Sequence, residues 1–257
     1  MVERFESALW QTASLLLAAD GKAVVVDPCI SSAEVAAIGA RAGELDVRVT
    51  DVLVTHADWD HVCGIAAFPD AVATMGARTA EIVTTGEPAR LIEQHAAEYD
   101  LEVAGPPRVD RVLAPGVAHR VGPFMVETLA LPGHTPDGVG YRVRSVDVLA
   151  VGDYLSAVEF PFASSTADYR STLEVLIVLL RDDPPTQVVP GHGPALTAAE
   201  ALAIAEADLA YLHALRDAVA RANDREAGLA VPLPRPAPAD LAEMRAANVE
   251  AQLEELR

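Results

Sequence analysis

Two histidines and two carboxylates crowd into one short stretch of this sequence. The segment THADWDH covers residues 55–61 and supplies His56, Asp58, Asp60 and His61. Imidazole and carboxylate are ligands that zinc, iron and manganese accept in proteins, and a donor set without thiolate argues against a purely structural metal site. The segment therefore predicts a metal centre that takes part in a reaction.

Three more side chains of metal-binding type occur at His134, Asp153 and His192, each next to a glycine. Each follows a predicted strand, and the glycine or proline beside it lets the backbone turn sharply. The segment 55–61 also follows a buried apolar strand, and α/β sheets bind ligands at the carboxyl ends of their strands. We therefore expect four loops to converge on one rim of the molecule and to form one site.

Strand and helix signals alternate along the chain and predict how these loops are positioned. Apolar runs of strand length cover residues 15–19, 23–26, 52–55, 71–75, 109–113, 117–121, 124–130, 139–144, 147–151 and 187–189. Segments of helical composition cover residues 32–42, 79–83, 88–99, 169–181, 198–222 and 240–257. Two halves, each made of strands followed by helices, predict a sandwich of two sheets between helical layers.

Two local signals define the first hairpin and the first helix. Asp20 and Gly21 lie between the first two predicted strands and favour a turn with positive φ. Ser31 or Ser32 is expected to cap the following helix, with Glu34 in its first turn. The first half of the chain is therefore expected to contain a β-hairpin followed by a helix.

The charge of the chain excludes two classes of partner. Aspartate and glutamate outnumber lysine and arginine by 38 to 19, which gives a formal net charge of -19. Phosphate backbones and anionic lipid surfaces repel such a polyanion, so nucleic acid and membranes are not expected as partners. A small-molecule substrate is the expected ligand.

Cysteine content and the start of the chain predict its location. Cys29 and Cys63 are the only cysteines, too few for a disulfide framework and typical of reduced thiols. Residues 1–7 are acidic where a signal peptide is basic, and the apolar run 14–19 is too short to cross a bilayer. We therefore expect a cytoplasmic protein.

The expected division of the chain places a catalytic domain at residues 1–228 and a tail at residues 229–257. Proline is frequent in residues 231–238, which favours an extended spacer, and the composition of residues 240–257 favours a helix. The tail is expected to pack on the body or on a partner subunit. A homodimer is one expected assembly.

The order of the metal-binding motifs resembles that of the metallo-β-lactamase superfamily. The family pattern is His-x-His-x-Asp-His, then a histidine in a Gly-His turn, an aspartate after a glycine, and a histidine in Pro-Gly-His. Agreement at several sites in family order is far more specific than any single motif. The resemblance implies an α+β fold, the αββα sandwich of two mixed β-sheets flanked by helices. The sequence departs from the pattern at Asp58 and matches it at His56, Asp60, His61, His134, Asp153 and His192.

The resemblance also implies a centre of two divalent metal ions, with zinc expected and iron or manganese as alternatives. Two such ions can hold a shared hydroxide and polarise a carbonyl or phosphoryl oxygen. The implied activity is hydrolysis of a small ester, thioester or lactone, with Asp60 as the catalytic residue that orients the water and receives its proton. The implied ligands are His56, Asp58 and His134 at the first metal, Asp60, His61 and His192 at the second, and Asp153 as a bridge.

Asp58 stands where the family pattern has a second histidine. A carboxylate adds negative charge to the first metal position and weakens its Lewis acidity. Three interpretations stay open: Asp58 is a ligand in a working dinuclear centre, it is too short to reach and the first metal is weak or absent, or the centre holds two irons and performs oxygen chemistry. The alternative function is therefore a di-iron oxygenase or oxidoreductase. A third hypothesis is a relative that has lost one metal and only binds a ligand.

Three other residues are predicted to contact the substrate: Trp59, Tyr154 and His213. Trp59 and Tyr154 flank metal-binding residues, and His213 lies in a long predicted helix that is expected to cross over the site. Aromatic residues and helix histidines also serve as ordinary core or surface residues, and that interpretation stays open for all three. Residues 160–162 form either a hydrophobic pocket lip or a loop packed on the body.

Several residues near the motifs have a structural alternative. Asp27 either holds the metal loop by a hydrogen bond, as the resemblance implies, or ends a strand in a plain turn. Cys63 is expected to be a small buried residue and not a nucleophile. His95 and His119 are expected to have structural or solvent-facing roles.

Overall fold

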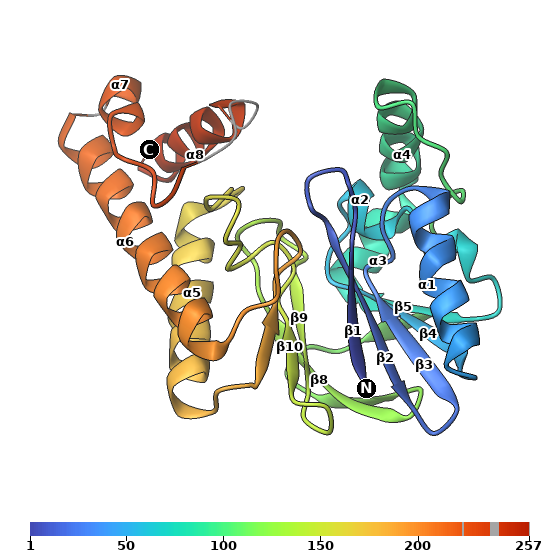
Figure 1. Cartoon of the computed structure of the whole chain (residues 1–257). Helices are drawn as coiled ribbons and strands as arrows, with labels where there is room; N and C mark the ends of the chain where they lie inside the picture. Colours follow the sequence, from blue (N-terminus) through green and yellow to red (C-terminus); the bar gives the residue numbers. More distant parts are fainter. Residues whose placement is uncertain (223, 237–241, 257) are drawn as a thin grey trace.

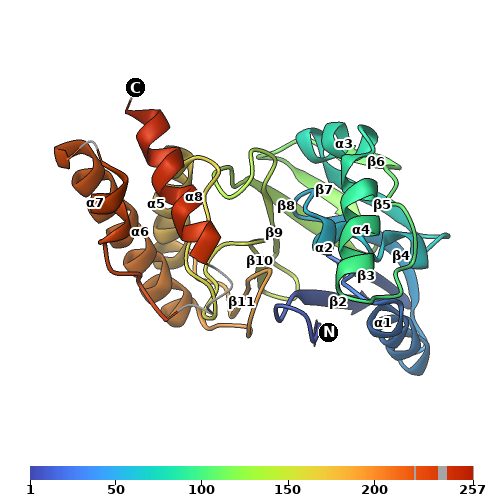
Figure 2. The ribbon, with the colours of Figure 1, turned by 90° about the horizontal axis from the view of Figure 1, so that it is seen from above.

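Two β-sheets face each other in the middle of the molecule, and helices cover the outer face of each sheet (Figure 1). The computed structural model describes residues 1–222, 224–236 and 242–256. Seen from above, the two helical layers lie at opposite ends of the molecule with the sheets between them (Figure 2). This order of layers confirms the predicted αββα sandwich.

The first sheet has six strands in the order β1-β2-β3-β4-β5-β6. Strands β1 to β3 are antiparallel neighbours, and β3 to β6 run parallel to one another. The sheet is therefore mixed, as predicted. Its strands are β1 (Val2–Glu6), β2 (Ala13–Ala19), β3 (Lys22–Val26), β4 (Arg48–Val54), β5 (Val72–Gly76) and β6 (Arg111–Leu113).

The second sheet has five strands in the order β11-β10-β9-β8-β7. Its β10 and β11 are parallel, and the other neighbours are antiparallel. This sheet is also mixed. Its strands are β7 (Ala118–Val121), β8 (Phe124–Ala130), β9 (Val139–Val143), β10 (Val148–Ala150) and β11 (Gln187–Val189).

The helices form one group beside each sheet (Figure 1). No helix within the described ranges is both long enough and apolar enough to span a lipid bilayer. The group beside the first sheet contains α1 (Ser32–Glu44), α2 (Trp59–Val62), α3 (Ala77–Thr84) and α4 (Glu87–Glu98), with a 3₁₀ turn at Ile65–Ala67. The group beside the second sheet contains α5 (Thr166–Asp182), α6 (Ala198–Ala222), α7 (Arg225–Leu229) and α8 (Ala242–Glu255).

Strand β3 shows how one strand serves two cores. Ala23 and Val25 belong to the cluster between the first sheet and its helices. Val24 and Val26 point the other way and pack between the sheets, in a cluster that includes Tyr141 of the second sheet. Successive side chains of a strand face opposite sides, so a strand buried on both faces is apolar throughout. This explains why the continuous apolar runs predicted the central strands well.

The structure confirms the predicted hairpin and first helix. Asp20 and Gly21 have φ angles of 52° and 69°, as the tight turn between β2 and β3 requires. Ser31 caps α1, and its side chain forms a reciprocal capping box with Glu34. Local sequence signals therefore determine both elements.

Four short elements of the described residues are absent from the prediction: helix α7, the 3₁₀ turn at Ile65–Ala67, strand β1 and helix α2. Strand β1 carries three charged residues in five and is only partly buried, because it is the edge strand of its sheet and pairs only with β2. Helix α2 is a single turn inside the metal-binding segment. None of the four is long enough to show an apolar periodicity that could be recognised.

The C-terminal helix α8 packs on α5, α6 and α7 of the same chain. Gln252 is buried, and its side-chain oxygen accepts from Thr166 Oγ1 at 2.9 Å and from Arg170 Nη1 at 3.0 Å. The predicted helical segment 240–257 begins and ends outside the described residues. The predicted domain boundary after residue 228 stays a prediction.

Candidate metal centre

Four loops at one rim of the molecule carry the seven predicted metal-binding side chains. His56 follows β4, and Asp58 two residues later is the N-cap residue of α2. The loops after β8, β10 and β11 supply His134, Asp153 and His192. The side chains form two groups, and within each group the ligand atoms lie within 4.8 Å of one another. The tertiary structure thus brings the four loops together.

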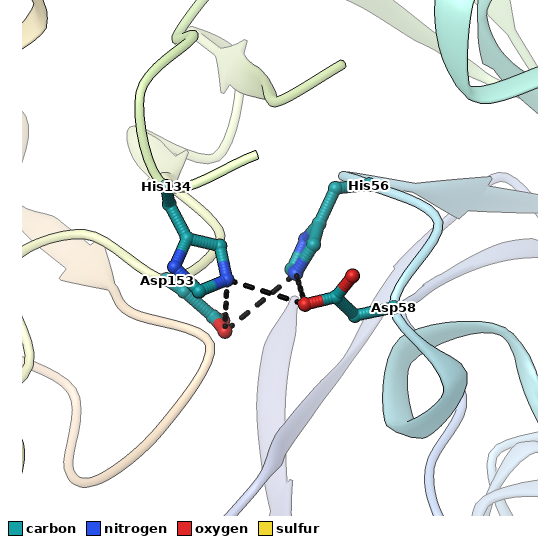
Figure 3. A group of neighbouring side chains, drawn as sticks. All are labelled: His56, Asp58, His134 and Asp153. Atoms are coloured by element: carbon teal, nitrogen blue, oxygen red, sulfur yellow. Dashed lines mark ion pairs between the residues drawn. The ribbon is translucent and has the colours of Figure 1, made fainter. Parts of the chain in front are cut away.

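The first group consists of His56, Asp58, His134 and Asp153. Asp58 Oδ2 lies 3.3 Å from Nε2 of His134 and 3.6 Å from Nε2 of His56. Asp153 Oδ2 lies 3.1 Å and 3.6 Å from the same two nitrogens. Figure 3 shows the four side chains pointing toward one another.

The second group consists of Asp60, His61 and His192. Asp60 Oδ2 lies 3.4 Å from Nε2 of His61 and 3.5 Å from Nε2 of His192. Asp153 reaches this group as well, with Oδ1 3.1 Å from Nε2 of His61 and Oδ2 3.2 Å from Nε2 of His192. Asp153 therefore contacts both groups, as a bridging ligand would.

The donor geometry fits metal ions. Ligand atoms held tetrahedrally at metal–nitrogen and metal–oxygen bond lengths lie about 3.4 Å apart, and the separations in both groups run from 3.1 to 3.6 Å. Buried polar atoms are rarely left unpaired in native proteins. In the centre, the buried ligand atoms without a hydrogen-bond partner among the described residues are Nε2 of His56, His61 and His134 and Oδ1 of Asp153. The two groups are therefore suited to two divalent metal ions.

Each of the four histidines directs Nε2 to the centre and Nδ1 to an oxygen atom. Such an oxygen accepts the Nδ1 proton, which leaves the lone pair of Nε2 free to bind a metal. The surroundings therefore select the tautomer that metal binding needs. The Nδ1 partners are Thr55 Oγ1 for His56 (3.0 Å), Asp27 Oδ2 for His61 (3.2 Å), the Phe162 carbonyl for His134 (2.9 Å) and the Trp10 carbonyl for His192 (3.1 Å).

Asp27 holds the first loop and is not only a turn residue. Its Oδ1 accepts from the backbone N–H of Thr55 at 2.8 Å, and its Oδ2 accepts from Thr55 Oγ1 at 2.7 Å. Because the Thr55 hydroxyl donates its proton to Asp27, the hydroxyl oxygen is left to accept from His56. The contacts of Asp27 therefore favour the interpretation that the family resemblance implied.

Asp58 reaches the first group although its side chain is shorter than that of histidine. Its Oδ2 lies 3.3 Å from Nε2 of His134, and the side chain is 45% exposed at the floor of a cavity. The interpretation that Asp58 is too short to reach is therefore not supported by this geometry.

Carboxylates keep protons on the histidines of the metal-free centre. Burial and the neighbouring His61 lower the pKa of His56, but Asp153 and Asp58 together outweigh both and raise that pKa to about 9. Burial also lowers the pKa of His192, but Asp153, with Glu159 and Asp60, outweighs burial and raises the pKa to about 9. At neutral pH both imidazoles hold a proton that a metal ion must displace.

We therefore expect the affinity for divalent metal to increase with pH between neutral pH and about 9. In this range a binding ion competes with protons on His56 and His192, and the competition weakens as these protons are lost. Chelator competition over this pH range measures the affinity, and a pH indicator in weak buffer measures the protons released. An affinity that is constant from neutral pH to the alkaline end of the range would contradict the expectation.

A cavity of about 270 Å³ opens above the centre. Its floor consists of ligand residues from both groups, so a bound molecule would touch them directly. Trp59 lines the cavity, and residues 160–162 line it as well. Residues 160–162 therefore form the predicted pocket lip.

Tyr154 and His213, two predicted substrate contacts, are not among the described residues that line this cavity. The buried Tyr154 hydroxyl donates to the Pro132 carbonyl at 2.7 Å and accepts from the backbone N–H of His134 at 3.0 Å. Tyr154 therefore supports the loop that carries a metal-binding residue. On α6 the cavity is lined by Asp208, and a side chain five residues further along a helix is rotated by about 140°. That rotation turns the half-buried His213 away from the cavity.

The cavity includes residues that the sequence did not mark as functional. Trp10 precedes β2, Glu159 lies in the loop before α5, and Asp208 and Met244 come from two helices. Their assembly depends on loop conformation and on the docking of helices, which leave no short-range signal.

Cys63, His95 and His119 have structural roles, as predicted, and Cys29 is buried as well. Burial raises the pKa of Cys29 to about 12 and that of Cys63 well above its usual value, so both thiols stay protonated. His95 stacks on Trp59 with ring centroids 4.8 Å apart. His119 pairs through Nε2 with the carbonyl of Ala114 at 2.9 Å.

Gly191 lets the carboxylate of Asp153 enter the centre. A Cβ at this position would overlap Oδ1 of Asp153 and lie 2.9 Å from Cε1 of His61. Gly191→Ala is therefore expected to displace Asp153, to weaken metal binding, and to lower the free energy of unfolding by about 1–3 kcal/mol. Urea unfolding and metal analysis of the purified variant measure the two effects.

Gly39→Ala is the matched control for this substitution. A Cβ at Gly39 in α1 meets nothing within 4 Å. This variant is expected to keep its metal and to gain up to about 1 kcal/mol of helix stability. Equal metal content in the two variants would show that the close approach of Gly191 to Asp153 is not needed for metal binding.

Comparison with known proteins agrees with the fold and the centre. The sequence profile of the metallo-beta-lactamase superfamily matches residues 8–192. A hydroxyacylglutathione hydrolase of Acidiphilium cryptum (strain JF-5) is 32% identical over 179 residues, which cover 69% of this chain and 62% of the relative. The chain spans between 46% and 62% of the length of the first curated relatives that it matches.

Two solved structures show the same fold. A metallo-beta-lactamase family protein from Thermus thermophilus has a TM-score of 0.72 at 20% identity, over 100% of this chain and 92% of that chain. The protein TTHA1623, solved in a di-iron-bound form, has a TM-score of 0.59 at 25% identity, over 77% of this chain and 96% of that chain. The chain belongs to the metallo-beta-lactamase superfamily, because the family profile matches well over half of its length.

Proposed function

We propose that this chain is a metal-dependent hydrolase that cleaves a small ester, thioester or lactone. The observation that carries the proposal is the pair of adjoining ligand groups at and beneath the floor of an open cavity, with one carboxylate in contact with both. Zinc is the proposed metal, and iron or manganese are the alternatives, because imidazole and carboxylate suit all three.

The proposed metal-holding residues are the seven side chains of the two groups. Two divalent ions bound there would polarise the scissile carbonyl group and lower the pKa of a nearby water molecule. Asp60 is proposed to orient that water and to take its proton. The Asp60 carboxylate accepts from Thr12 Oγ1 at 3.3 Å, a contact that restrains its orientation.

Within this class, a thioester has additional support. The Acidiphilium cryptum relative is named a hydroxyacylglutathione hydrolase. The family profile, which matches residues 8–192, covers the region that contains all seven proposed ligands. An acyl thioester is therefore the first substrate class to assay.

A di-iron centre for oxygen chemistry is the second candidate function. Asp58, Asp60 and Asp153 supply three carboxylates to the two groups, and hard oxygen ligands suit iron. The protein TTHA1623 was solved with two irons. The observation that favours this candidate is the carboxylate of Asp58 at the first position.

Metal analysis of protein purified without added metal, together with thioester assays, tests these functions. Two zinc ions per chain and turnover of an acyl thioester would support hydrolysis. Two irons, an oxygen-sensitive visible absorption and no hydrolysis would support oxygen chemistry instead. Less than one ion per chain with no turnover would support a protein that only binds a ligand. The cytoplasmic location and the homodimer stay predictions.

A further inference from the structure

The cavity above the metal centre has apolar side chains on two sides. Trp10, Trp59 and Tyr99 line it near α2 and α4, and residues 160–162 and Met244 line it near α5 and α8. Figure 1 shows α4 and α8 at the same end of the molecule on opposite sides. A molecule in the cavity would therefore lie between two apolar walls, with its reactive group over the ligand residues.

The wall near α4 is built of aromatic rings that hold one another in place. The ring of Trp10 meets the rings of Trp59 and Tyr99 edge-on, with centroids 5.5 Å apart in both pairs. Trp59 is only 6% exposed and stacks on His95 behind it. Edge-on and stacked contacts stabilise such ring clusters, so this wall is formed before a ligand arrives.

Outside the two metal-binding groups, the charged residues in the lining are Glu159 and Asp208. Arg235 forms a salt bridge with Asp208 and donates to the carbonyl of Glu159, so its guanidinium is already engaged. Neither lysine nor arginine occurs among the described residues of the lining. Away from the metal centre, a carboxylate on the substrate would therefore find no free cationic side chain among these residues to pair with.

We propose that the substrate presents an uncharged apolar or aromatic group to the two walls and carries no carboxylate. The size agrees, because a protein cavity of about 150 Å³ holds benzene, and the volume here is about 270 Å³. A phenyl group and a short link to the scissile bond therefore fit. Glutathione carries two carboxylates, so a glutathione thioester lies outside this class. As a statement about a substrate, the proposal rests on the proposed hydrolase function.

Tryptophan fluorescence tests the ligand class without any reaction. Trp10 and Trp59 are the two tryptophans of the chain, and both line the cavity. S-benzyl-N-acetylcysteamine and S-benzylglutathione share a benzyl thioether that cannot be hydrolysed as a thioester, and only the second is anionic. With the metal-loaded protein, the neutral compound is expected to change the fluorescence and to bind at least about tenfold more tightly. Equal or tighter binding of S-benzylglutathione, or no binding of either compound, would overturn the proposal.

Two methionine variants locate the binding. Met244→Ala removes apolar surface from one wall, and Met125→Ala removes a similar side chain from the exposed face of β8. The first is expected to weaken binding of the neutral thioether about fivefold, and the second to leave it unchanged. Equal effects in the two variants would place the compound outside the cavity and overturn the proposal.

Hydrolysis is assayed separately, with the phenylacetyl thioesters of N-acetylcysteamine and glutathione. Faster turnover of the neutral thioester is expected. If the neutral thioether binds but neither thioester is cleaved, the hydrolase function fails and the ligand class stands. If only the glutathione thioester is cleaved, the hydrolase function stands and the ligand class fails.

The loop between β10 and α5 touches the metal centre through the carbonyl group of Phe162. That carbonyl pairs with Nδ1 of His134 at 2.9 Å, and the two rings meet edge-on with centroids 5.6 Å apart. The bond orients the imidazole so that Nε2 faces Asp58 and Asp153. The direction of the Phe162 carbonyl therefore decides where this nitrogen points.

Asn248 on α8 binds the residues on both sides of Phe162. Its Nδ2 donates to the carbonyl of Pro161 at 2.6 Å, and its Oδ1 accepts from the backbone N–H of Ala163 at 2.8 Å. The side chain is completely buried, with 0% exposure. Holding the peptide groups on both sides fixes the orientation of the residue between them.

From this arrangement we infer that Asn248 is a positioning residue for His134, acting through the Phe162 carbonyl. The C-terminal helix then contributes to metal binding without supplying a ligand. Removal of a residue that orients a metal ligand by hydrogen bonding typically lowers the metal affinity by about 10–100-fold. We therefore expect Asn248→Ala to weaken metal binding at the first group about tenfold.

Gln252→Ala is the matched control on the same helix. Gln252 anchors α8 to Thr166 and Arg170 of α5 and makes no hydrogen bond to Pro161 or Ala163 among the described residues. This variant is expected to keep its metal affinity, measured by chelator competition. An equal loss in Gln252→Ala would show that only the docking of α8 matters, and would overturn the inference.

A second measurement uses the metal-free protein. The proton on Nδ1 of His134 is expected to give a slowly exchanging NMR signal in the unmodified protein and in Gln252→Ala. In Asn248→Ala this signal is expected to disappear. If Asn248→Ala does not fold, Asn248→Asp serves the same test, because it keeps the acceptor for Ala163 and removes the donor to Pro161. A folded variant with unchanged metal affinity and an unchanged His134 signal would overturn the inference.

Discussion

Replacing Asp153 by asparagine is expected to remove both metal ions from the protein. The carboxylate lies 3.1 to 3.6 Å from Nε2 of all four histidines of the centre. Burial raises the pKa of Asp153, but the histidines outweigh burial and hold it well below its usual range, so the group is ionised. Asparagine removes that charge and presents an N–H donor to a metal. We expect the metal affinity at both positions to fall by more than about 10²-fold. This is the upper end of the loss seen when a residue that only hydrogen-bonds to a metal ligand is removed.

Asp217→Asn makes the same chemical change on the surface of α6 and is the control. Its side chain is 50% exposed and pairs with the adjacent Arg216, so both metal ions should remain. Elemental analysis after removal of free metal gives the ion count per chain. Retention of one tightly bound ion in Asp153→Asn would contradict the bridging role.

Asp58→Ala is expected to remove one metal ion and leave the other. Asp58 contacts His56 and His134 and belongs to the first group only. The second group keeps all its members, so one ion per chain should stay bound. Hydrolysis that needs two ions should then fall by at least about 10²-fold, as expected when an ion that activates water or carbonyl is lost. Metal analysis and a thioester assay on the same preparation measure both effects.

Asp58→His supplies the matching variant, because histidine restores the common family pattern at this position. It should bind two ions and, since a neutral ligand leaves the metal a stronger Lewis acid, keep hydrolytic activity. Unchanged metal content and activity in Asp58→Ala would show that Asp58 is not a metal ligand. If the unmodified protein prefers iron and the Asp58→His variant does not, the result would instead support the di-iron candidate.

The sequence predicted most strands and helices because their signals are local. Strand β3 is apolar at four of its five positions, and β2 and β3 join through a turn whose residues take positive φ. Such signals depend on neighbours in the chain and on burial of both faces of a sheet. Strand β1 escaped prediction because its partly exposed edge position tolerates charges.

The candidate substrate contacts were harder to predict. Trp59 lies beside ligands in sequence and lines the cavity, whereas Tyr154 has a similar position in sequence and supports the His134 loop from behind. His213 lies on the expected helix, but the helical rotation presents Asp208 to the cavity. Which way a side chain faces depends on how its helix or loop packs on the rest of the protein. The sequence shows only the periodicity of side chains along the helix.

By itself, the sequence determined the types of ligand and the loops that carry them. His134, Asp153 and His192 each follow a strand and stand beside a glycine, and the other four ligands are crowded into one segment directly after β4. Residue type, spacing and local turn chemistry are therefore sufficient to mark them. Only the tertiary structure decided that Asp58 reaches the first group, that Trp10 and Met244 share one cavity, and that Asn248 supports His134. The Asn248 bonds join residues 85 and 87 positions apart, and contacts of that range exist only after the helices have docked on the sheets.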